Sequence, residues 1–334
     1  MKKLGILVAV LLLLAAAAVA WIYLGIRQPF RGYSASEQFV DIPPGLGTKG
    51  IGERLVAAGV VRDTLTFRVA MRLEGRAARL KAGEYRFTDP MTPFDVIDKL
   101  RRGDVFVIST TFPEGLNVFE MAKIFESKGF GTAQSFVDAA RSSEGYLFPD
   151  TYPLSRHTDA KKLVHLMRET FERELTPDIR AAAQTRGLSI PQLVTLASIV
   201  EKETGNASER PLVASVYENR LRLGMALQCD PTVIYALELT GHYDGNIRRD
   251  DLMIDSPYNT YRYPGLPPGP IASPGRASLE AVVHPADSDY LYFVSRNDGT
   301  HVFAKTLAEH TKNVQHFQVE YFRAGRTGKA GKAP

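Results

Sequence analysis

An uncharged apolar run near the N-terminus constrains the fold of this chain more than any other feature. The run covers residues 4–26, which is about the length that a helix needs to cross a bilayer. Trp21 and Tyr23 stand near its far end, where interfacial aromatic side chains are common. We therefore expect a membrane helix, with the rest of the chain folded outside the bilayer.

The apolar run is either cleaved by signal peptidase or retained as a membrane anchor. The segment Ala18-Val-Ala20 is similar to the small-residue site of signal peptidase. The run exceeds the apolar core of about 7–15 residues that signal peptides have, and it continues past the alanines. This favours an uncleaved anchor over residues 4–26 with a cytoplasmic stub at residues 1–3. Lys2 and Lys3 favour that orientation, although basic residues also follow the run.

Composition places the remaining chain among globular proteins of two or three domains. The chain has 334 residues, with 44% hydrophobic and 23% charged residues. The net charge of +4 is matched by the cations of a predicted disordered tail over residues 323–334, which are Arg323, Arg326, Lys329 and Lys332. The body is therefore near neutral, which argues against a nucleic-acid partner.

Cysteine and histidine usage gives no support to a metal or disulfide framework. Cys229 is the single cysteine, so no internal disulfide can form, and we expect it to be a small buried residue. No CxxC or HExxH motif occurs. We predict neither a metal site nor a cofactor.

A sequence repeat with an offset of 70 residues follows the apolar run. The segment IPPGL at residues 42–46 recurs as FPEGL at residues 112–116, and Ile51 then aligns with Met121. Each copy predicts a strand, a glycine-containing turn and a short amphipathic helix. We group both copies in one region, residues 38–143. Its modules either bind a ligand of their own or only pack against the following domain.

Capping residues and periodicity predict most of the other elements. We expect a strand at 83–87 and helices at 92–100, 159–175, 177–187 and 191–203, a helix ending at Gly224, a hairpin at 290–303 and a closing helix at 307–322. Ser208 or Asn206 is expected to cap the helix that ends at Gly224. Asp230, directly before Pro231, is expected to cap the next helix.

Two carboxylates end the helix at 191–203. The stretch LASIVEKETG at residues 196–205 places its apolar side chains on one face, and Glu201 and Glu203 on opposite edges of that face. A carboxylate at such a border is partly desolvated, which raises its pKa and makes it a proton donor near neutrality. The alternative is two solvated carboxylates at a frayed helix end. Periodicity does not separate Glu201 from Glu203.

Further blocks follow in a fixed order. They are residues 208–221, residues 227–235 (LQCDPTVIY), residues 258–261 (YNTY) and residues 265–271 (GLPPGPI). Together with residues 196–205, they resemble the endolytic murein transglycosylases, the YceG-like family. The resemblance runs from roughly residue 39 to residue 321. It implies that Glu201, the first Glu of its block, is the catalytic acid and base.

The resemblance implies a substrate and a location. The substrate is the MurNAc-GlcNAc strand of peptidoglycan, cut internally to leave 1,6-anhydro-MurNAc ends, with one Glu acting as general acid and then as base. The implied partners are peptidoglycan glycan strands, the membrane and peptidoglycan synthases. The implied location is the cytoplasmic (inner) membrane, with the catalytic part on the periplasmic side. Two alternatives are a hydrolytic muramidase acting on the same bond and a non-catalytic wall-binding scaffold.

The resemblance also implies a fold. We expect an α+β chain with a transmembrane helix, small LysM-like β-α modules at residues 38–143 and a catalytic domain at residues 144–322. That domain is expected to be mostly helical, lysozyme-like and fitted with a β-hairpin. The aromatic segment at residues 144–152 opens it, either as part of a sugar cleft or as a rigid junction.

Candidate substrate contacts come mainly from the irregular stretch at residues 241–275. Its Tyr258, Asn259 and Tyr261 combine an amide with aromatic rings, which suit sugar binding. Asn259 ranks first, and Gln228, which has no capping duty, ranks second. Glu203 is a further candidate. The alternative is a rigid lid without ligand contact.

Overall fold

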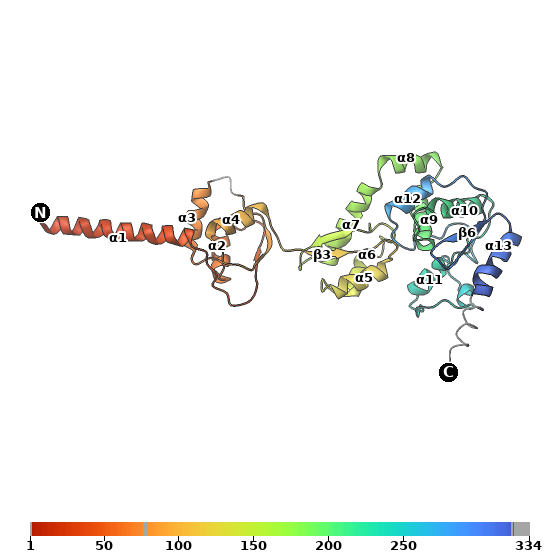
Figure 1. Cartoon of the computed structure of the whole chain (residues 1–334), viewed down its shortest axis with the longest axis horizontal. Coiled ribbons are helices and arrows are strands. Elements are labelled where there is room, and N and C mark those ends of the chain that lie inside the picture. Colours follow the sequence, from red (N-terminus) through yellow and green to blue (C-terminus); the bar gives the residue numbers. More distant parts are fainter. Residues whose placement is uncertain (1, 76–78, 322, 324–334) are drawn as a thin grey trace, which may run out of the picture. The chain divides into compact units, whose positions relative to one another are not determined.

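The computed structural model describes residues 2–75, 79–321 and 323, and the chain divides into two compact units (Figure 1). The first unit comprises Met1–Ile108 with Pro153–Ser155, and the second comprises Ser109–Tyr152 with Arg156–Pro334. Both units combine helices with small two-stranded sheets. The mixed α+β class expected from the sequence is confirmed. The predicted tail lies outside the described residues except for Arg323.

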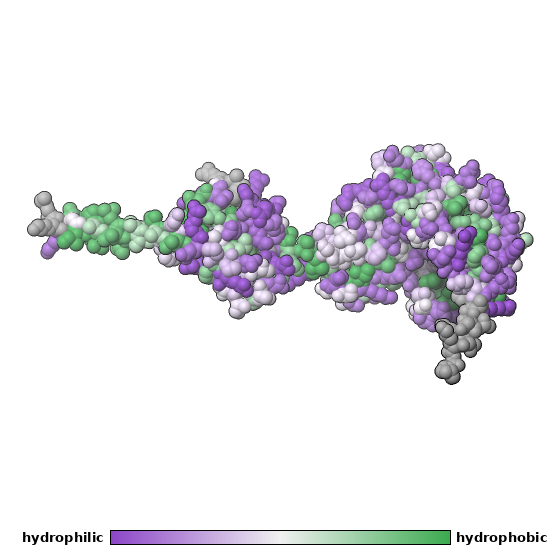
Figure 2. Space-filling model, viewed as in Figure 1, coloured by the Kyte–Doolittle hydropathy of each residue, from purple (hydrophilic) through white to green (hydrophobic). Residues whose placement is uncertain are grey.

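Helix α1 (Lys2–Arg27) contains the apolar run. Its side chains are exposed along most of its length and form a continuous apolar surface (Figure 2). Residues Lys3–Arg27 are long and apolar enough to cross a membrane or to serve as a signal sequence. Near its end, Ile22 and Ile26 turn inward and join the hydrophobic core of the first unit. Helix α1 is therefore built into that folded unit.

The first unit packs three helices on one antiparallel strand pair. Its elements are β1 (Gln38–Ile42), α2 (Thr48–Ala57), α3 (Thr64–Glu74), β2 (Gly83–Phe87) and α4 (Pro93–Arg102). Helix α4 begins with a capping box between Thr92 and Asp95 and ends at Gly103, whose φ of 78° suits glycine. Val40 pairs with Tyr85 across the sheet, and both are buried. The predicted strand and helix of this region are confirmed.

The second copy of the repeat has the same order of elements as the first. It consists of β3 (Ile108–Thr111), α5 (Val118–Ser127), α6 (Ala133–Ala140) and β4 (Thr151–Leu154), and β3 pairs with β4 as β1 pairs with β2. Gly45 and Gly115 occupy equivalent turns with φ of 80° and 77°. The repeat is thus confirmed as a structural repeat. Its LysM-like character and the domain boundary at residue 143 stay predictions.

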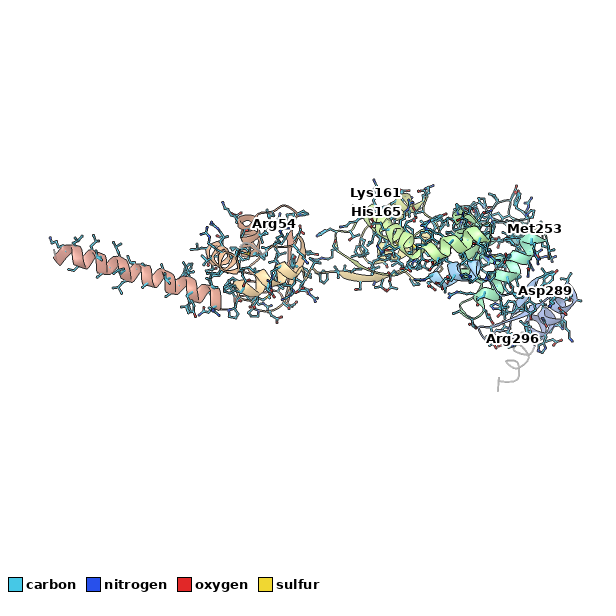
Figure 3. All side chains as sticks on the ribbon, turned by 90° about the horizontal axis from the view of Figure 1, so that it is seen from above. Arg54, Lys161, His165, Met253, Asp289 and Arg296 are labelled. Atoms are coloured by element: carbon cyan, nitrogen blue, oxygen red, sulfur yellow. The ribbon has the colours of Figure 1, made fainter. Side chains whose placement is uncertain are left out.

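The remaining elements of the second unit include one helix that is buried by its neighbours. They are α7 (Ala160–Glu174), α8 (Pro177–Thr185), α9 (Ile190–Glu203), α10 (Arg210–Arg222), α11 (Asp230–Leu239), η1 (Asp251–Met253), α12 (Arg276–Val283), β5 (Tyr292–Ser295), β6 (His301–Ala304), α13 (Leu307–Val314) and the π-helical η2 (Gln315–Glu320). Helix α9 is buried from Leu193 to Val200 and contacts α8, α10, α11 and α12. By contrast, α7 keeps a solvent face that carries Lys161 and His165 (Figure 3). A lysozyme-like arrangement stays a prediction.

Two helix starts differ from the sequence prediction. Neither Ser208 nor Asn206 caps α10. Glu209 holds the N-cap position, and its carboxylate instead accepts a hydrogen bond from the His301 backbone N–H at 2.9 Å. Helix α11 starts one residue early: Cys229 is the N-cap and makes no side-chain cap, so Asp230 lies in the first turn. The carboxylate of Asp230 is therefore available for another role.

Candidate active site

The two carboxylates at the end of α9 have different environments, and Glu201 is held in an ion pair. Its side chain is only 5% exposed. The Arg210 guanidinium donates to Oε1 at 2.9 Å, and the Gly275 backbone N–H donates to Oε2 at 3.0 Å. Arg210 also reaches Glu114 at 3.3 Å. Glu201 therefore links α9 and α10 to two loops, and both of its oxygens are occupied.

Glu203 lines a pocket. The cavity measures about 260 Å³ and is lined by Glu203, Tyr217, Arg220, Leu227, Gln228, Asp230, Tyr261, Phe293 and His310. The Tyr217 hydroxyl donates to Glu203 Oε1 at 2.7 Å. Burial raises the pKa of Glu203, and the charge of Asp230 raises it further, against the lowering effect of hydrogen bonds from Cys229 and Tyr217. A carboxyl whose pKa is raised in a pocket is a candidate proton donor.

Asp230 supplies a second carboxylate to this pocket. The Tyr261 hydroxyl donates to Asp230 Oδ1 at 2.6 Å. Because Cys229 rather than Asp230 is the N-cap of α11, the expected capping role of Asp230 is wrong. The pocket therefore contains two carboxyl groups. The pKa of Glu203 is raised, and Asp230 is held in place by the Tyr261 hydroxyl.

Gln228 reaches the pocket from a strained backbone. Its φ is 52°, one of two positive values at non-glycine residues in the described chain. The left-handed region is costly for a residue with a Cβ, and such positions gather at functional sites. The Gln228 backbone N–H donates to the Thr260 carbonyl at 3.2 Å, which fixes the strained turn against the loop at residues 258–261.

Asn259 does not lie in the pocket. Its side chain is fully buried, and its amide nitrogen donates to the carbonyls of Leu252 at 3.0 Å and Ile254 at 2.8 Å. Its Oδ1 accepts the Tyr261 backbone N–H at 3.0 Å. These contacts hold the loop in shape and leave the amide no free donor. The structure therefore corrects the prediction that Asn259 is the first sugar contact, because its side chain binds backbone groups of its own loop.

The other tyrosines of the loop separate in the same way. Tyr261 lines the pocket with Glu203. Tyr258 instead packs edge-to-face on Tyr235, with ring centroids 5.0 Å apart, and is not among the pocket residues. The structure thus brings Gln228, Tyr261 and Glu203 together and leaves Tyr258 and Asn259 outside.

Replacing Asn259 by Ala is expected to reduce stability much more than turnover. The change leaves two buried carbonyls and one backbone N–H without partners, so the free energy of unfolding should fall by about 1–3 kcal/mol or more. Urea unfolding measures this loss, with Asn246→Ala, an exposed asparagine in the same stretch, as the matched control. A stable Asn259→Ala protein that has lost its turnover would restore Asn259 as a substrate ligand.

Glu144 is a partly buried carboxyl that the sequence did not single out by itself. It accepts hydrogen bonds from the Val118 N–H at 3.1 Å, the Tyr235 hydroxyl at 3.2 Å and the Gly145 N–H at 3.3 Å. Burial raises its pKa to about 7, although these hydrogen bonds lower it. Glu144 joins the start of α5 to α11. The segment at residues 144–152 thus contributes to a junction inside the second unit.

Stability is expected to depend on pH through Glu144. The folded pKa of about 7 lies above the 4.5 of an ordinary Glu, so the folded protein binds this proton more tightly than the unfolded chain does. The stabilisation is complete below about pH 4.5 and is lost as pH rises through 7, by about 3 kcal/mol in total. Urea unfolding across this window should show a clearly smaller loss in Glu144→Gln than in the parent protein, because the raised pKa of Glu203 contributes in both. Equal slopes in both proteins would contradict it.

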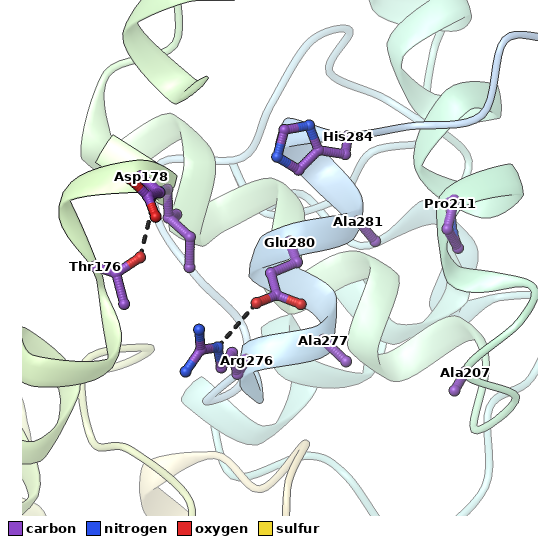
Figure 4. Close-up of a pocket in the computed structure, with 10 residues that line it drawn as sticks. Thr176, Asp178, Ala207, Pro211, Arg276, Ala277, Glu280, Ala281 and His284 are labelled. Atoms are coloured by element: carbon purple, nitrogen blue, oxygen red, sulfur yellow. Dashed lines mark hydrogen bonds and ion pairs between the residues drawn. The ribbon is translucent and has the colours of Figure 1, made fainter. Parts of the chain in front are cut away.

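A larger concavity lies elsewhere on the second unit. It measures about 420 Å³ between α8 and α12 (Figure 4) and contains none of the predicted site residues. Arg276 Nε donates to Glu280 at 2.8 Å, so two of its charged side chains satisfy each other. His284 is the C-cap residue of α12. We assign the active-site candidate to the Glu203 pocket, because three of the predicted site residues, Glu203, Gln228 and Tyr261, line it.

Several pocket residues carry no signal that singles them out in the sequence. Tyr217 and Arg220 lie on α10. Arg220 is buried, and it donates to the carbonyls of Leu227 at 2.8 Å and Leu291 at 2.7 Å. Phe293 and His310 reach the pocket from β5 and α13. Helical spacing with Val213 could have indicated that Tyr217 faces the core.

The fold and the pocket first define a class: a protein of helices and small two-stranded sheets with a candidate acid–base site at the end of a buried helix. The sequence then specifies the family, because residues 40–316 match the YceG-like family. The chain belongs to that family, as the blocks around Glu201 indicated. Within the described residues, no group of three or more His, Cys, Asp or Glu side chains is arranged to hold a metal ion.

Similar proteins cover most of the chain. An endolytic murein transglycosylase of Bacillus subtilis is 31% identical over 85% of this chain and 86% of its own length. An endolytic murein transglycosylase of Streptococcus pneumoniae is 29% identical over 82% of this chain, and the match covers 57% of that longer protein. The crystal structure of a YceG-like protein from Listeria monocytogenes matches with a TM-score of 0.54 at 29% identity, covering 83% of this chain and 98% of the other.

Proposed function

We propose that this protein is a peptidoglycan lytic transglycosylase that cuts glycan strands internally between MurNAc and GlcNAc and leaves 1,6-anhydro-MurNAc ends. Family membership and the activity named for the relatives support the reaction class. The observation that carries the proposal is the protonatable carboxyl of Glu203 in a polar pocket. The pocket offers donors and acceptors of the kind that orient sugars.

We assign the general acid to Glu203 rather than to Glu201, which the family resemblance favoured in the sequence. Glu201 has both oxygens engaged by Arg210 and Gly275, and it does not line the pocket. The guanidinium and the backbone N–H hold Glu201 as a structural link between α9, α10 and the loop at Gly275. Glu203 has a different environment, since burial and the nearby Asp230 favour its neutral form.

The proposed reaction uses one carboxyl twice. Because Tyr217 donates to Oε1, the acidic proton of Glu203 is placed on Oε2. That proton passes to the glycosidic oxygen as its bond to the anomeric carbon breaks. The carboxylate then takes the proton of the sugar's own 6-hydroxyl while that oxygen bonds to the anomeric carbon. The anhydro ring forms, Glu203 regains its proton, and no water is consumed.

Gln228, Tyr261 and Asp230 are assigned to substrate positioning. Tyr261 and Asp230 are hydrogen-bonded to each other, so they present an aromatic face and a carboxylate in a fixed relation. Gln228 offers an amide from a turn that its backbone contact to Thr260 holds in place. Intramolecular attack by the 6-hydroxyl depends on such orientation, because the reacting atoms must be held close and aligned.

Asp230 also favours a second candidate function, hydrolysis of the same bond. Glycoside hydrolases generally use two carboxyl groups, one as the acid and one as base or nucleophile. The Glu203 pocket contains such a pair. Mass spectrometry of purified glycan strands after digestion separates the two functions. Anhydro ends support the transglycosylase, reducing ends support the muramidase, and intact strands contradict both.

We further propose that α1 remains attached as a single membrane span, with both units on the periplasmic side of the cytoplasmic membrane and the glycan strand and peptidoglycan synthases as partners. The repeated modules at residues 38–143 would act as LysM-like glycan contacts ahead of a lysozyme-like domain at residues 144–322. Support for the anchor comes from the exposed apolar surface of α1 and the burial of Ile22 and Ile26 in the first unit.

Retention of α1 predicts the N-terminus of the mature protein. N-terminal sequencing of protein extracted from membranes should not begin at Trp21, the residue after the alanine segment that signal peptidase could cleave. Extraction with alkaline carbonate should leave the protein in the membrane fraction. A mature chain that starts at Trp21 would make this a cleaved, secreted protein.

A further inference from the structure

We propose that the outer face of α3 docks on anionic phospholipid headgroups at the place where α1 leaves the bilayer. The inference rests on the membrane anchorage by α1 proposed above. It adds a second, reversible membrane contact in the first unit. Such a contact restricts the tilt of that unit against the membrane surface, which a single span at its edge does not.

The position of α3 next to the end of α1 is the first step. A Cβ added to Gly25 would lie 2.7 Å from Thr66 Cγ2, so the last turn of α1 touches the first turn of α3. The core of the first unit includes Ile26 from α1 and Phe67 from α3. In Figure 1, α3 lies beside the end of α1 and runs across its direction. A bilayer that contains α1 therefore has α3 near its surface.

The outer face of α3 is apolar along its centre. Leu65, Val69 and Leu73 recur every four residues and form one stripe. Leu65 and Leu73 are 47% and 68% exposed, and Val69 between them is half-buried against the core of the first unit. The opposite face carries Phe67 and Ala70, which are fully buried. A helix with one face in the core needs no second apolar face for folding. The stripe is therefore a candidate surface for insertion between headgroups.

Arginines flank the stripe. Arg68 and Arg72 are exposed on α3, and neither pairs with a carboxylate in the part of the chain that the structure describes. The acidic residues of this helix are at its ends: Asp63 is the N-cap and accepts the Thr66 N–H at 2.8 Å, and Glu74 is the last residue. A central pair of cations around exposed leucines matches the charge and depth profile of an anionic headgroup layer.

A concavity adjoins this surface. It measures about 540 Å³ and is lined by Thr48, Leu65, Arg68, Val69, Met71, Arg72 and Gly75. Its lining combines guanidinium groups with apolar side chains, which is the chemistry that a phosphate with its attached chains requires. The last turn of α1 touches the first turn of α3, so a bilayer that contains α1 places lipid beside this concavity. We therefore commit to lipid rather than to a second copy of the chain.

The test uses the full chain in vesicles, with probes on two exposed apolar residues of the first unit. A fluorescent label whose emission depends on polarity is attached at Leu73→Cys, with Val107→Cys as the matched control. Cys229 is buried and does not compete for the label. The vesicles contain phosphatidylcholine with or without phosphatidylglycerol, and spin-labelled lipid is the quencher. Trp21, the single tryptophan of the chain, reports separately on the insertion of α1.

We expect spin-labelled lipid to quench the Leu73 probe in phosphatidylglycerol vesicles and to leave the Val107 probe unquenched. Replacing Arg68 or Arg72 by Glu should lower the ratio of docked to undocked protein by about fivefold or more each. Quenching of Trp21 without quenching at Leu73 would overturn the docking and leave the anchor intact. Quenching at neither site would overturn both. A polarity change at Leu73 that grows with protein density and resists lipid quenching would indicate a second copy and also overturn it.

Discussion

Glu203→Gln is expected to reduce turnover of glycan strands by about 10²–10⁴-fold or more, the usual contribution of a general acid. The amide keeps the shape of the side chain, and its oxygen still accepts the Tyr217 hydroxyl that now lies 2.7 Å from Oε1. Folding should therefore be preserved, and the loss should appear in the rate of the reaction. The rate of release of soluble fragments from purified strands measures it.

Two other glutamates serve as controls for this result. Glu218→Gln changes an exposed carboxylate on α10 that pairs with Arg186 outside the pocket, so turnover should be unchanged. Glu201→Gln should keep turnover of the folded protein within about tenfold, because Glu201 does not line the pocket. A Glu203→Gln protein with normal turnover, beside an inactive but stable Glu201→Gln protein, would return the acid to Glu201.

Loss of the Glu201–Arg210 pair is expected to have the largest effect on stability. Both side chains are nearly inaccessible, and Arg210 Nε already lacks a hydrogen-bond partner. Glu201→Ala should lower the free energy of unfolding by about 3–5 kcal/mol, because Arg210 keeps only the half-exposed Glu114 as a counter-charge among the residues that the structure describes. Urea unfolding measures the loss.

A double substitution isolates the pair. In Glu201→Leu with Arg210→Met, no buried charge is left without a partner, so stability should recover much of what each single change loses. Additive losses would show that the two side chains stabilise the fold through separate contacts. In that case Glu201 would not be the structural link between α9 and α10 that its hydrogen bonds indicate.

The fold was predictable where local signals agree with one another. Thr92, Asp95 and Gly103 bound α4 because a capping box and a left-handed glycine act within a few residues of the chain. The repeat with an offset of 70 residues predicted the order of strand and helix in both copies, because the same spacing of apolar residues favours the same local structure. The division of the chain after Ile108 was not predictable, because it depends on which copy packs with the later helices.

The site was predictable as a region but not residue by residue. Glu201 and Glu203 stand two positions apart on α9, and only the neighbours decide their roles: Arg210 reaches one and Tyr217 reaches the other. A shift of the α11 start by one residue freed Asp230 from capping, and sequence rules fix a helix end only to within a residue or two. The role of Asn259 was not predictable, because the sequence does not show whether an amide side chain binds backbone groups or a sugar.

Digestion of glycan strands in water labelled with heavy oxygen tests the central claim most directly. If the sugar's own 6-hydroxyl attacks the anomeric carbon, the new ends of the glycan strands carry no label and have the mass of the anhydro sugar. If Glu203 is the acid and base of this reaction, Glu203→Gln forms almost no such ends. Hydrolysis with Asp230 as the second carboxyl would instead place one labelled oxygen in every new reducing end. Labelled ends, or unlabelled ends formed at the normal rate by Glu203→Gln, would contradict the account.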